Sequence, residues 1–354
     1  MSARARRRVT FVCDSDAWGG AEVYLTHHLR RADENGWTAS LVVAEPVAAG
    51  FAGLLPPDRV AVVPLARHTR EAPAVRDAVG ASRPDVVAVN LVDPASNAAA
   101  VDAALAVAPT VATLHLEGDT RSGAEREALA ARYRRLAAVL APSSVIRAQL
   151  LADLGVPPDR ARVVHNGVDL PADPAGPAAA AVPRLGALGR LVAQKGFDVL
   201  LAATRRVVDD GVPVELVIGG AGRDEAALRA AAEGLPVTFT GFVDDVRGFL
   251  RGLDVFCLSS RRDALPLALL EAMAEGLPCV ATDVGDVRAV VGEEVAVVPV
   301  EDAGALAAAL HPLLTDPARR AAAAAAARRR AEASLDAALM ARRTFAVLAE
   351  VVRS

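Results

Sequence analysis

The chain has 354 residues, enough for about two domains, and 53 % of them are hydrophobic, which excludes an intrinsically disordered chain. Lysine and arginine number 39 against 43 acidic residues, a formal net charge of −4 that disfavours a general nucleic-acid-binding protein. The three cysteines are far apart, which disfavours a disulfide framework and a cysteine-rich zinc site.

The chain begins with a basic stretch that contains Arg4, Arg6, Arg7 and Arg8 and runs directly into an apolar segment at Val9. This segment is too short for a secretory signal and no cleavage pattern follows it, so we expect a cytoplasmic protein. No apolar run approaches the roughly 20 residues that span a bilayer. The arginines suit peripheral contact with the anionic inner face of a membrane, and the alternative is a solvated tail ahead of the first strand.

Through the first half of the chain, short runs of valine, isoleucine and leucine alternate with helical patterns. Continuous apolar runs between helices predict a parallel sheet covered on both faces. The predicted strands are Val9–Cys13, Ser40–Ala44, Val60–Leu65, Val86–Leu91, Val111–Leu114, Val139–Ala141 and Arg162–His165. The predicted helices follow Gly20 as far as Gly36, and cover Pro94–Ala108, Ala124–Leu136 and Ser144–Leu154.

The segment 171–183 is rich in proline and alanine and has no periodicity, which is typical of a linker. The alternation of strands and helices then restarts. The predicted strands are Leu185–Leu188, Val214–Gly219, Val237–Thr240, Val255–Leu258, Cys279–Thr282 and Val295–Val298. The predicted helices are Phe197–Asp209, Glu225–Glu233, Leu267–Glu275 and Ala303–Leu314.

From Asp316 onward the chain is rich in alanine and arginine, which predicts one or two long helices. The run Ala321–Ala327 and its flanking arginines could be taken for a nucleic-acid patch, but arginines on a helix usually form a solvated face. We therefore expect two doubly wound α/β domains, 1–170 and 184–335, and a C-terminal helix, 336–354, that packs back on the first domain. Such domains bind ligands at the carboxyl ends of their strands, here in a cleft between the two domains.

Several familiar motifs are missing or incomplete. The run Gly219-Gly220-Ala221-Gly222 follows a predicted strand but lacks the third glycine of the dinucleotide fingerprint. The sequence has no GxxxxGK[ST], GxSxG or HExxH, so a simple P-loop nucleotidase, a nucleophile elbow and a standard zinc protease site are disfavoured.

Polar residues at strand-to-helix junctions remain as candidates. Arg190 and Lys195 lie in the loop that starts at Gly189, between a predicted strand and a predicted helix, and both suit phosphate oxygens. The alternative is an exposed basic loop. Gly19 and Gly20 join the first predicted strand to the first helix, where glycine permits close approach of a ligand.

A second junction precedes the helix that begins at Pro266, whose free N–H groups form an anion site. Glu271 lies in that helix among leucines, where a carboxylate needs a partner. It suits the vicinal hydroxyls of a ribose, and the alternatives are an outward orientation or a pair with a nearby arginine. His115 ends a predicted strand, where it is either a structural hydrogen-bonding residue or a group that faces the same expected cleft.

Taken together, these segments resemble the retaining nucleotide-sugar glycosyltransferases of family 4 (group 1), which have the GT-B fold of two Rossmann-like domains. The resemblance covers nearly the whole chain, and the joint order of its motifs is specific. The matching runs are Gly19-Gly20-Ala21-Glu22, His165-Asn166-Gly167-Val168-Asp169, Gly189-Arg190-Leu191 with Lys195-Gly196, Ile218-Gly219-Gly220-Ala221-Gly222, Thr240-Gly241-Phe242-Val243, and the stretch from Asp263 through Leu269-Leu270-Glu271-Ala272-Met273 to Gly285.

The resemblance implies that the second domain binds a nucleoside-diphosphate sugar and that the first takes the acceptor. Arg190 and Lys195 would neutralise the diphosphate, Glu271 would bind the ribose, and Asp263 would bind the donor sugar. His115 would contact the sugar near the reacting carbon. Gly19 and Gly20 would close over the phosphates, and Phe242 and Val243 would lie beside the base. The other implied donor contacts are Gly189 and the backbone of Ala264, Leu265, Pro266 and Leu267.

The family pattern has glutamate where this chain has Asp263, which is one methylene shorter and bears on which sugar fits. The resemblance implies transfer to an acceptor hydroxyl with retention of configuration, without a metal ion or another cofactor. The acceptor would be a small molecule, a glycan or a glycolipid, and no nucleic-acid partner is expected. The alternatives are a nucleotide-sugar epimerase, a phosphorylase, and a non-catalytic protein that binds a nucleotide sugar.

Overall fold

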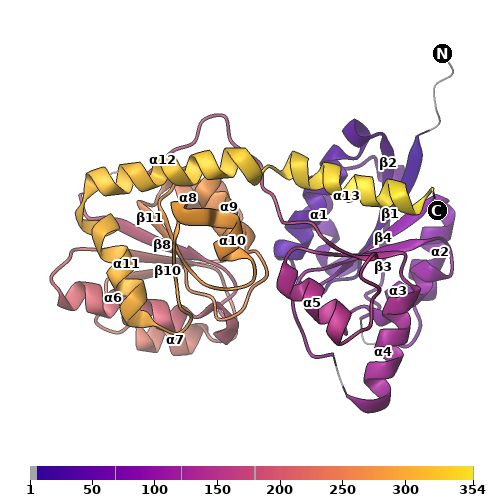
Figure 1. The fold of residues 1–354 in the computed structure, drawn as a ribbon, viewed down its shortest axis with the longest axis horizontal. Helices are drawn as coiled ribbons and strands as arrows, with labels where there is room; N and C mark the ends of the chain where they lie inside the picture. Colours follow the sequence, from indigo (N-terminus) through magenta and orange to yellow (C-terminus); the bar gives the residue numbers. More distant parts are fainter. Residues whose placement is uncertain (1–5, 68, 121, 179–180, 354) are drawn as a thin grey trace. The chain divides into compact units, whose positions relative to one another are not determined.

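The computed structural model describes residues 6–353 except 68, 121, 179 and 180. The chain forms two compact units (Figure 1). The first contains Met1–Asn166 and Ala337–Ser354, and the second contains Gly167–Asp336. The chain therefore passes from one unit to the other twice.

A fully parallel sheet in the order β3-β2-β1-β4-β5-β6-β7 forms the centre of the first unit. Each of its strands corresponds to a run expected from sequence, and the inner strands are short stretches rich in buried apolar residues, whereas the two edge strands are only partly buried. The strands are β1 (Arg7–Cys13), β2 (Trp37–Ala44), β3 (Val60–Val63), β4 (Val86–Leu91), β5 (Thr110–Leu114), β6 (Ala138–Ala141) and β7 (Ala161–Val163).

The helices of this unit are α1 (Gly20–Arg31), α2 (Pro73–Ser82), α3 (Ala98–Leu105), α4 (Gly123–Arg135), α5 (Ser144–Ala152) and α13 (Ala337–Val351). Helix α2 was not expected from sequence. Helix α13 shares a core with α1 and β1: Phe345 stacks on Trp37 with ring centroids 6.0 Å apart and meets Phe11 edge-on at 6.4 Å. This aromatic contact holds the last helix of the chain on the first unit.

Arg6, Arg7 and Arg8, the described arginines of the basic start, belong to the fold or contact it. Arg7 and Arg8 belong to β1, Arg6 forms an ion pair with Asp33 at 2.9 Å, and the Arg7 guanidinium lies 5.7 Å from the centre of the Trp37 ring. Arg4 lies outside the described residues. Two of these arginines therefore have partners within the fold.

The second unit is built on a fully parallel sheet in the order β10-β9-β8-β11-β12-β13. Its order reverses between β8 and β11, so the loops after these two strands lie side by side at the carboxyl edge, where doubly wound sheets bind ligands. The strands are β8 (Arg184–Leu188), β9 (Glu215–Gly219), β10 (Val237–Gly241), β11 (Val255–Leu258), β12 (Cys279–Thr282) and β13 (Ala296–Val298), as expected from sequence.

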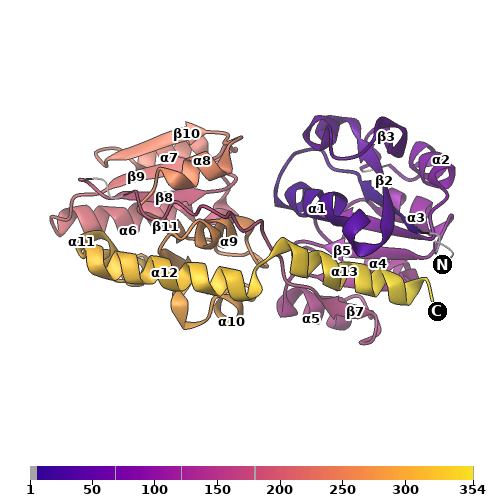
Figure 2. The ribbon, with the colours of Figure 1, turned by 90° about the horizontal axis from the view of Figure 1, so that it is seen from above.

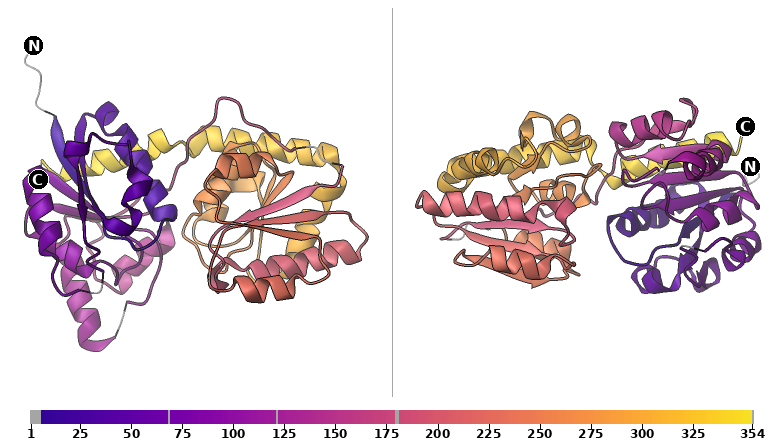
Figure 3. Two further views of the ribbon diagram at one scale, coloured as in Figure 1. Left: turned by 180° about the vertical axis from the view of Figure 1, so that it is seen from behind. Right: turned by 90° about the horizontal axis from the view of Figure 1, so that it is seen from below.

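Helices cover both faces of this sheet: α6 and α7 lie on one side, and α9 and α12 on the other (Figures 1 and 3). The short helices α8 and α10 were not expected from sequence. The helices are α6 (Phe197–Asp209), α7 (Glu225–Ala231), α8 (Val246–Arg251), α9 (Leu267–Ala274), α10 (Val287–Val291), α11 (Ala303–Thr315) and α12 (Pro317–Ser334).

Several arginines of α12 have structural partners. Arg320 is buried and donates to the carbonyl of Leu313 near the end of α11 at 3.1 Å, and Arg330 donates to that of Val290 in α10 at 2.6 Å. Both therefore place positive charge at the carboxyl ends of neighbouring helices, where it is favourable. Helix α12 runs along the unit in the view from above (Figure 2).

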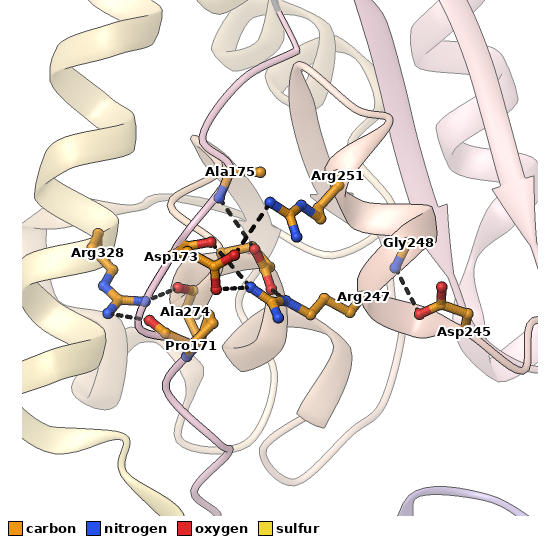
Figure 4. A network of polar contacts seen from close by, with 10 residues as sticks. Pro171, Asp173, Ala175, Asp245, Arg247, Gly248, Arg251, Ala274 and Arg328 are labelled. Carbon is orange, nitrogen blue, oxygen red and sulfur yellow. Dashed lines mark hydrogen bonds and ion pairs between the residues drawn. The ribbon is translucent and has the colours of Figure 1, made fainter.

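The segment 171–183, expected to be a linker, belongs to the second unit (Figure 4). Its backbone is held at several points. Arg328 donates to the Pro171 carbonyl at 2.8 Å, and Glu275 accepts from the amide of Ala175 at 3.2 Å. Arg247 joins the buried Glu275 to Asp173, with 2.6 Å to each. Its proline-rich composition predicted a linker, and its polar groups find partners on α8, α12 and the end of α9.

Candidate active site

The loops that follow β8, β9, β10, β11 and β12 are joined at the carboxyl edge of the second sheet. Backbone hydrogen bonds connect the loop after β8 to that after β9 (Leu191 to Ala221, 2.9 Å) and to that after β11 (Arg261 to Gln194, 2.8 Å). The Gly220 amide donates to the Gly241 carbonyl at 2.7 Å. The predicted donor-binding loops therefore form one continuous surface.

Two glycines let the loop after β11 lie close to its neighbours. Gly196 has φ +64° and Gly285 has φ +51°, conformations that favour glycine. A β-carbon on Gly196 would collide with the Ser259 carbonyl, and one on Gly285 with the Ala264 carbonyl. These contacts hold residues 259–264 from both sides.

Lys195 and Asp263, predicted separately, form an ion pair with 2.6 Å between Nζ and Oδ2. The side chains are 18 % and 7 % exposed, so solvent screens the pair weakly. The Ser260 hydroxyl donates to the same Oδ2 at 3.0 Å. The shorter aspartate therefore still reaches the lysine, and Ser260 fixes its orientation.

Arg190 and Arg261 differ in their partners. Arg261 binds both carboxylate oxygens of Asp198 at 2.7 Å and also Glu301 at 2.5 Å, and these partners raise the pKa of its guanidinium. Arg190 is exposed, and its side chain makes no hydrogen bond or ion pair within the described part of the chain. Arg261 thus anchors its loop, whereas Arg190 is available to a ligand.

Helix α9 begins at this edge. Pro266 stands at its N-cap, and no side chain caps the helix, so its first-turn N–H groups offer an anion site beside the buried Ala264, Leu265 and Leu267.

Glu271 is partly buried on α9, and its carboxylate has no hydrogen-bond or ion-pair partner among the described residues. The expected alternative of a pair with a nearby arginine is therefore not found there. Burial, with a smaller contribution from the Asp169 carboxylate, raises the pKa of Glu271 to about 7.

The residues expected beside the base follow β10. Phe242 is 59 % exposed, which is unusual for a large apolar side chain, and Val243 is partly buried next to Gly219. An exposed ring at a sheet edge offers a flat surface on which a base can stack.

Gly19 and Gly20 lie at the start of α1 in the first unit. Glu22, on α1, has a buried carboxylate beside Cys13, with 3.9 Å between Cys13 Sγ and Glu22 Oε1. Burial raises the pKa of Glu22. His115 follows β5 and is 8 % exposed. Its Nε2 lies 2.6 Å from Oδ1 of Asn90, whose Nδ2 donates to the Ala21 carbonyl at 3.0 Å.

The predicted residues therefore lie in two groups. Lys195, Asp263, Arg190 and the start of α9 share the carboxyl edge of the second unit, and His115 is linked to the first turn of α1 in the first unit. Sequence reasoning missed Asn90, and gave no separate role to Ser260 or Arg261 in a loop that it had singled out.

Within the described ranges, no group of three or more histidine, cysteine or acidic side chains is placed to hold a metal ion.

Each half of the chain matches a known protein-family profile. Residues 18–171 match the profile of Glycosyltransferase Family 4, and residues 182–316 match that of Glycosyl transferases group 1. A phosphatidyl-myo-inositol mannosyltransferase of Mycobacterium leprae is 39 % identical over 163 residues, 43 % of each chain. A GDP-mannose-dependent mannosyltransferase of Mycobacterium tuberculosis is 40 % identical over 95 residues, 26 % of this chain and 25 % of that one. The matched stretches span less than half the length of these relatives.

Solved structures show the same fold over nearly the whole chain. Anabaena HepE, solved with UDP and glucose, has a TM-score of 0.79 at 19 % identity and covers 96 % of this chain and 99 % of its own. Sucrose-phosphate synthase of Thermosynechococcus elongatus has a TM-score of 0.76 at 18 % identity, with 98 % and 99 % covered. No helix among the described residues is long and apolar enough to cross a membrane. With a profile match in each half and the GT-B fold throughout, the chain belongs to the family 4 (group 1) glycosyltransferases.

Proposed function

We propose that this protein transfers a sugar from a nucleoside-diphosphate sugar to an acceptor hydroxyl, with retention of configuration and without a metal ion. One observation carries the proposal: an arginine without a side-chain partner among the described residues, a lysine and an uncapped helix start share the carboxyl edge of the second sheet. These are the groups that bind a diphosphate. Retention is what the family resemblance implies.

The partners of each group suggest how the donor binds. Arg190 meets the diphosphate without first breaking an ion pair, whereas Lys195 exchanges its contact with Asp263 for a phosphate oxygen. This exchange leaves the Asp263 carboxylate, still held by Ser260, to accept hydrogen bonds from the sugar hydroxyls. Glu271, which has no protein partner among the described residues, binds the ribose.

The reaction needs these charges most in its transition state. When the bond between sugar and phosphate breaks, negative charge grows on the departing diphosphate and positive charge on the anomeric carbon. Arg190, Lys195 and the N–H groups of α9 stabilise the first of these, and the helix N–H groups, which the fold holds in place, need little reorganisation.

The relatives suggest the donor and acceptor to test first. Those with the higher sequence identity are named mannosyltransferases, one of them GDP-mannose-dependent, whereas HepE was solved with UDP. We therefore propose GDP-mannose as the first donor and a UDP-hexose as the second. Relatives named for phosphatidylinositol and lipopolysaccharide core suggest a glycolipid or glycan acceptor, reached from the cytoplasmic face of a membrane.

The test combines a thermal-shift screen of GDP, UDP, ADP and TDP with turnover of the matching sugar nucleotides. We expect one nucleoside diphosphate to raise Tm, because a ligand that binds only the folded state stabilises it. Arg190→Ala should lower turnover by about 10²-fold. The matched control is Arg329→Ala on α12, which removes the same charge from an exposed position.

Equal turnover in wild type and Arg190→Ala would refute the assigned role of Arg190. A donor that is bound but never consumed in the presence of acceptors would favour the non-catalytic alternative. Conversion of one sugar nucleotide into another, without an acceptor product, would favour the epimerase.

A further inference from the structure

We propose that Asn90 is a positioning residue that fixes His115 as the tautomer protonated at Nε2 and leaves Nδ1 as a hydrogen-bond acceptor for a hydroxyl of the donor sugar. The first part rests on geometry in the first unit, and the second rests on the proposed function.

The Asn90 amide has one workable orientation. Its nitrogen lies 3.0 Å from the Ala21 carbonyl, which only accepts hydrogen bonds, so the NH₂ group must face that carbonyl. The amide oxygen then faces Nε2 of His115 at 2.6 Å. Since an amide oxygen only accepts, Nε2 must carry the proton, and the neutral ring keeps its lone pair on Nδ1.

The surroundings keep this arrangement rigid. Asn90 is 3 % exposed, and its own carbonyl lies 3.4 Å from Nδ2 of Asn97. The Tyr24 ring meets the His115 ring edge-on, with centroids 4.7 Å apart. Burial, and to a smaller extent the nearby His28, lower the pKa of His115 to about 3, so the ring is neutral at pH 7. A neutral ring protonated at Nε2 can accept a hydrogen bond at Nδ1 but cannot donate one there.

This arrangement joins two predicted parts of the site. Asn90 binds the first turn of α1, next to Gly19 and Gly20, and at the same time binds His115. Strands β4 and β5 make this possible, because they are neighbours in the sheet and place Asn90 opposite Thr113, two residues before His115. A displacement of α1 would therefore move Asn90 and, through it, the imidazole ring of His115.

The test reads the tautomer directly in the full-length protein labelled with ¹⁵N-histidine. Long-range ¹H–¹⁵N correlation at pH 7 distinguishes the two ring nitrogens, and His115→Gln assigns the His115 signal. We expect Nε2 to be protonated in wild type. Asn90→Leu should lose this single tautomer, and Asn90→Asp, which keeps an acceptor for Nε2–H, should retain it. The matched control is Thr344→Val, which removes the partner of His28 Nε2 in the same core but has no hydrogen bond to Asn90 or His115 to remove among the described residues.

Turnover of the donor provides the second readout. Asn90→Leu should lower kcat by about tenfold to a hundredfold with a smaller change in KM, because a misplaced group affects the transition state more than ground-state binding. A wild-type ring protonated at Nδ1, or an unchanged tautomer in Asn90→Leu, overturns the proposal. So does a lost tautomer with unchanged kcat. If wild type turns over no donor, the proposed function fails, and the tautomer measurement still decides the role of Asn90.

Discussion

Glu271→Gln should make the protein more stable at pH 8, even though Glu271 belongs to the proposed site. The side chain is partly buried and its carboxylate has no partner among the described residues, and burial raises its pKa from 4.5 to about 7. That shift corresponds to about 3 kcal/mol, at roughly 1.4 kcal/mol per pKa unit. Glutamine removes the charge while keeping the shape of the side chain.

The sign follows from proton binding. Between pH 4.5 and about 7 the folded protein holds a proton on Glu271 that the unfolded chain has released. The contribution of Glu271 to the free energy of unfolding therefore falls as the pH rises through this window, and it stays low above pH 7. Glu271→Gln should gain stability over wild type from pH 5 to pH 8, by up to about 3 kcal/mol.

Glu275 is the matched control, because it is buried at the end of the same helix but has partners. It binds Arg247 at 2.6 Å and the Ala175 amide at 3.2 Å, so Glu275→Gln should destabilise the protein by about 1–3 kcal/mol. Urea unfolding of both variants and wild type at pH 5 and pH 8 measures these effects. The reasoning is refuted if Glu271→Gln is less stable than wild type at pH 8. It is also refuted if the free energy of unfolding changes by the same amount between pH 5 and pH 8 in the variant and in wild type. Glu271→Gln should also bind the nucleoside diphosphate more weakly than wild type, as measured by calorimetry.

Three further predictions concern other parts of the molecule. Phe345→Ala should lower the free energy of unfolding by about 3–5 kcal/mol, because Phe345 is 3 % exposed in the core shared by α13 and α1, and an effect under 1 kcal/mol would contradict that packing. Arg261→Ala should lower turnover with a smaller effect on Tm, because its loop carries Asp263, and unchanged turnover would show that the anchor has no role in the reaction. Addition of EDTA should leave turnover unchanged, and an activity restored only by Mg²⁺ would contradict the proposed scheme.

Sequence reasoning predicted both sheets because each strand is a short apolar run between helical patterns, which is the signature of a doubly wound fold. It missed α8 and α10, which have six and five residues, because so few residues show no helical period. It predicted 171–183 as a linker but did not predict the contacts of this segment. Composition indicates how stiff a segment is. It does not show that Glu275 and Arg328, about 100 and 157 positions away, form hydrogen bonds with the backbone of this segment.

The site shows the same division. Arg190, Lys195 and Asp263 could be found because they fall in loops directly after strands, where chain order alone fixes their place. Asn90 lies inside a strand and could not be found, because its importance depends on the neighbouring strand that brings His115 within 2.6 Å. Ser260 could be read as part of a loop, but its bond to Asp263 depends on a side-chain rotamer that sequence does not specify.

The central claim is that the diphosphate binds at the carboxyl edge of the second sheet. A crystal structure of the complex with the nucleoside diphosphate that raises Tm most tests it directly. We predict phosphate oxygens within hydrogen-bond distance of Arg190 and Lys195 and beside the first turn of α9, with the 2.6 Å contact between Lys195 and Asp263 broken. A nucleotide bound elsewhere, with that contact intact, would contradict the claim.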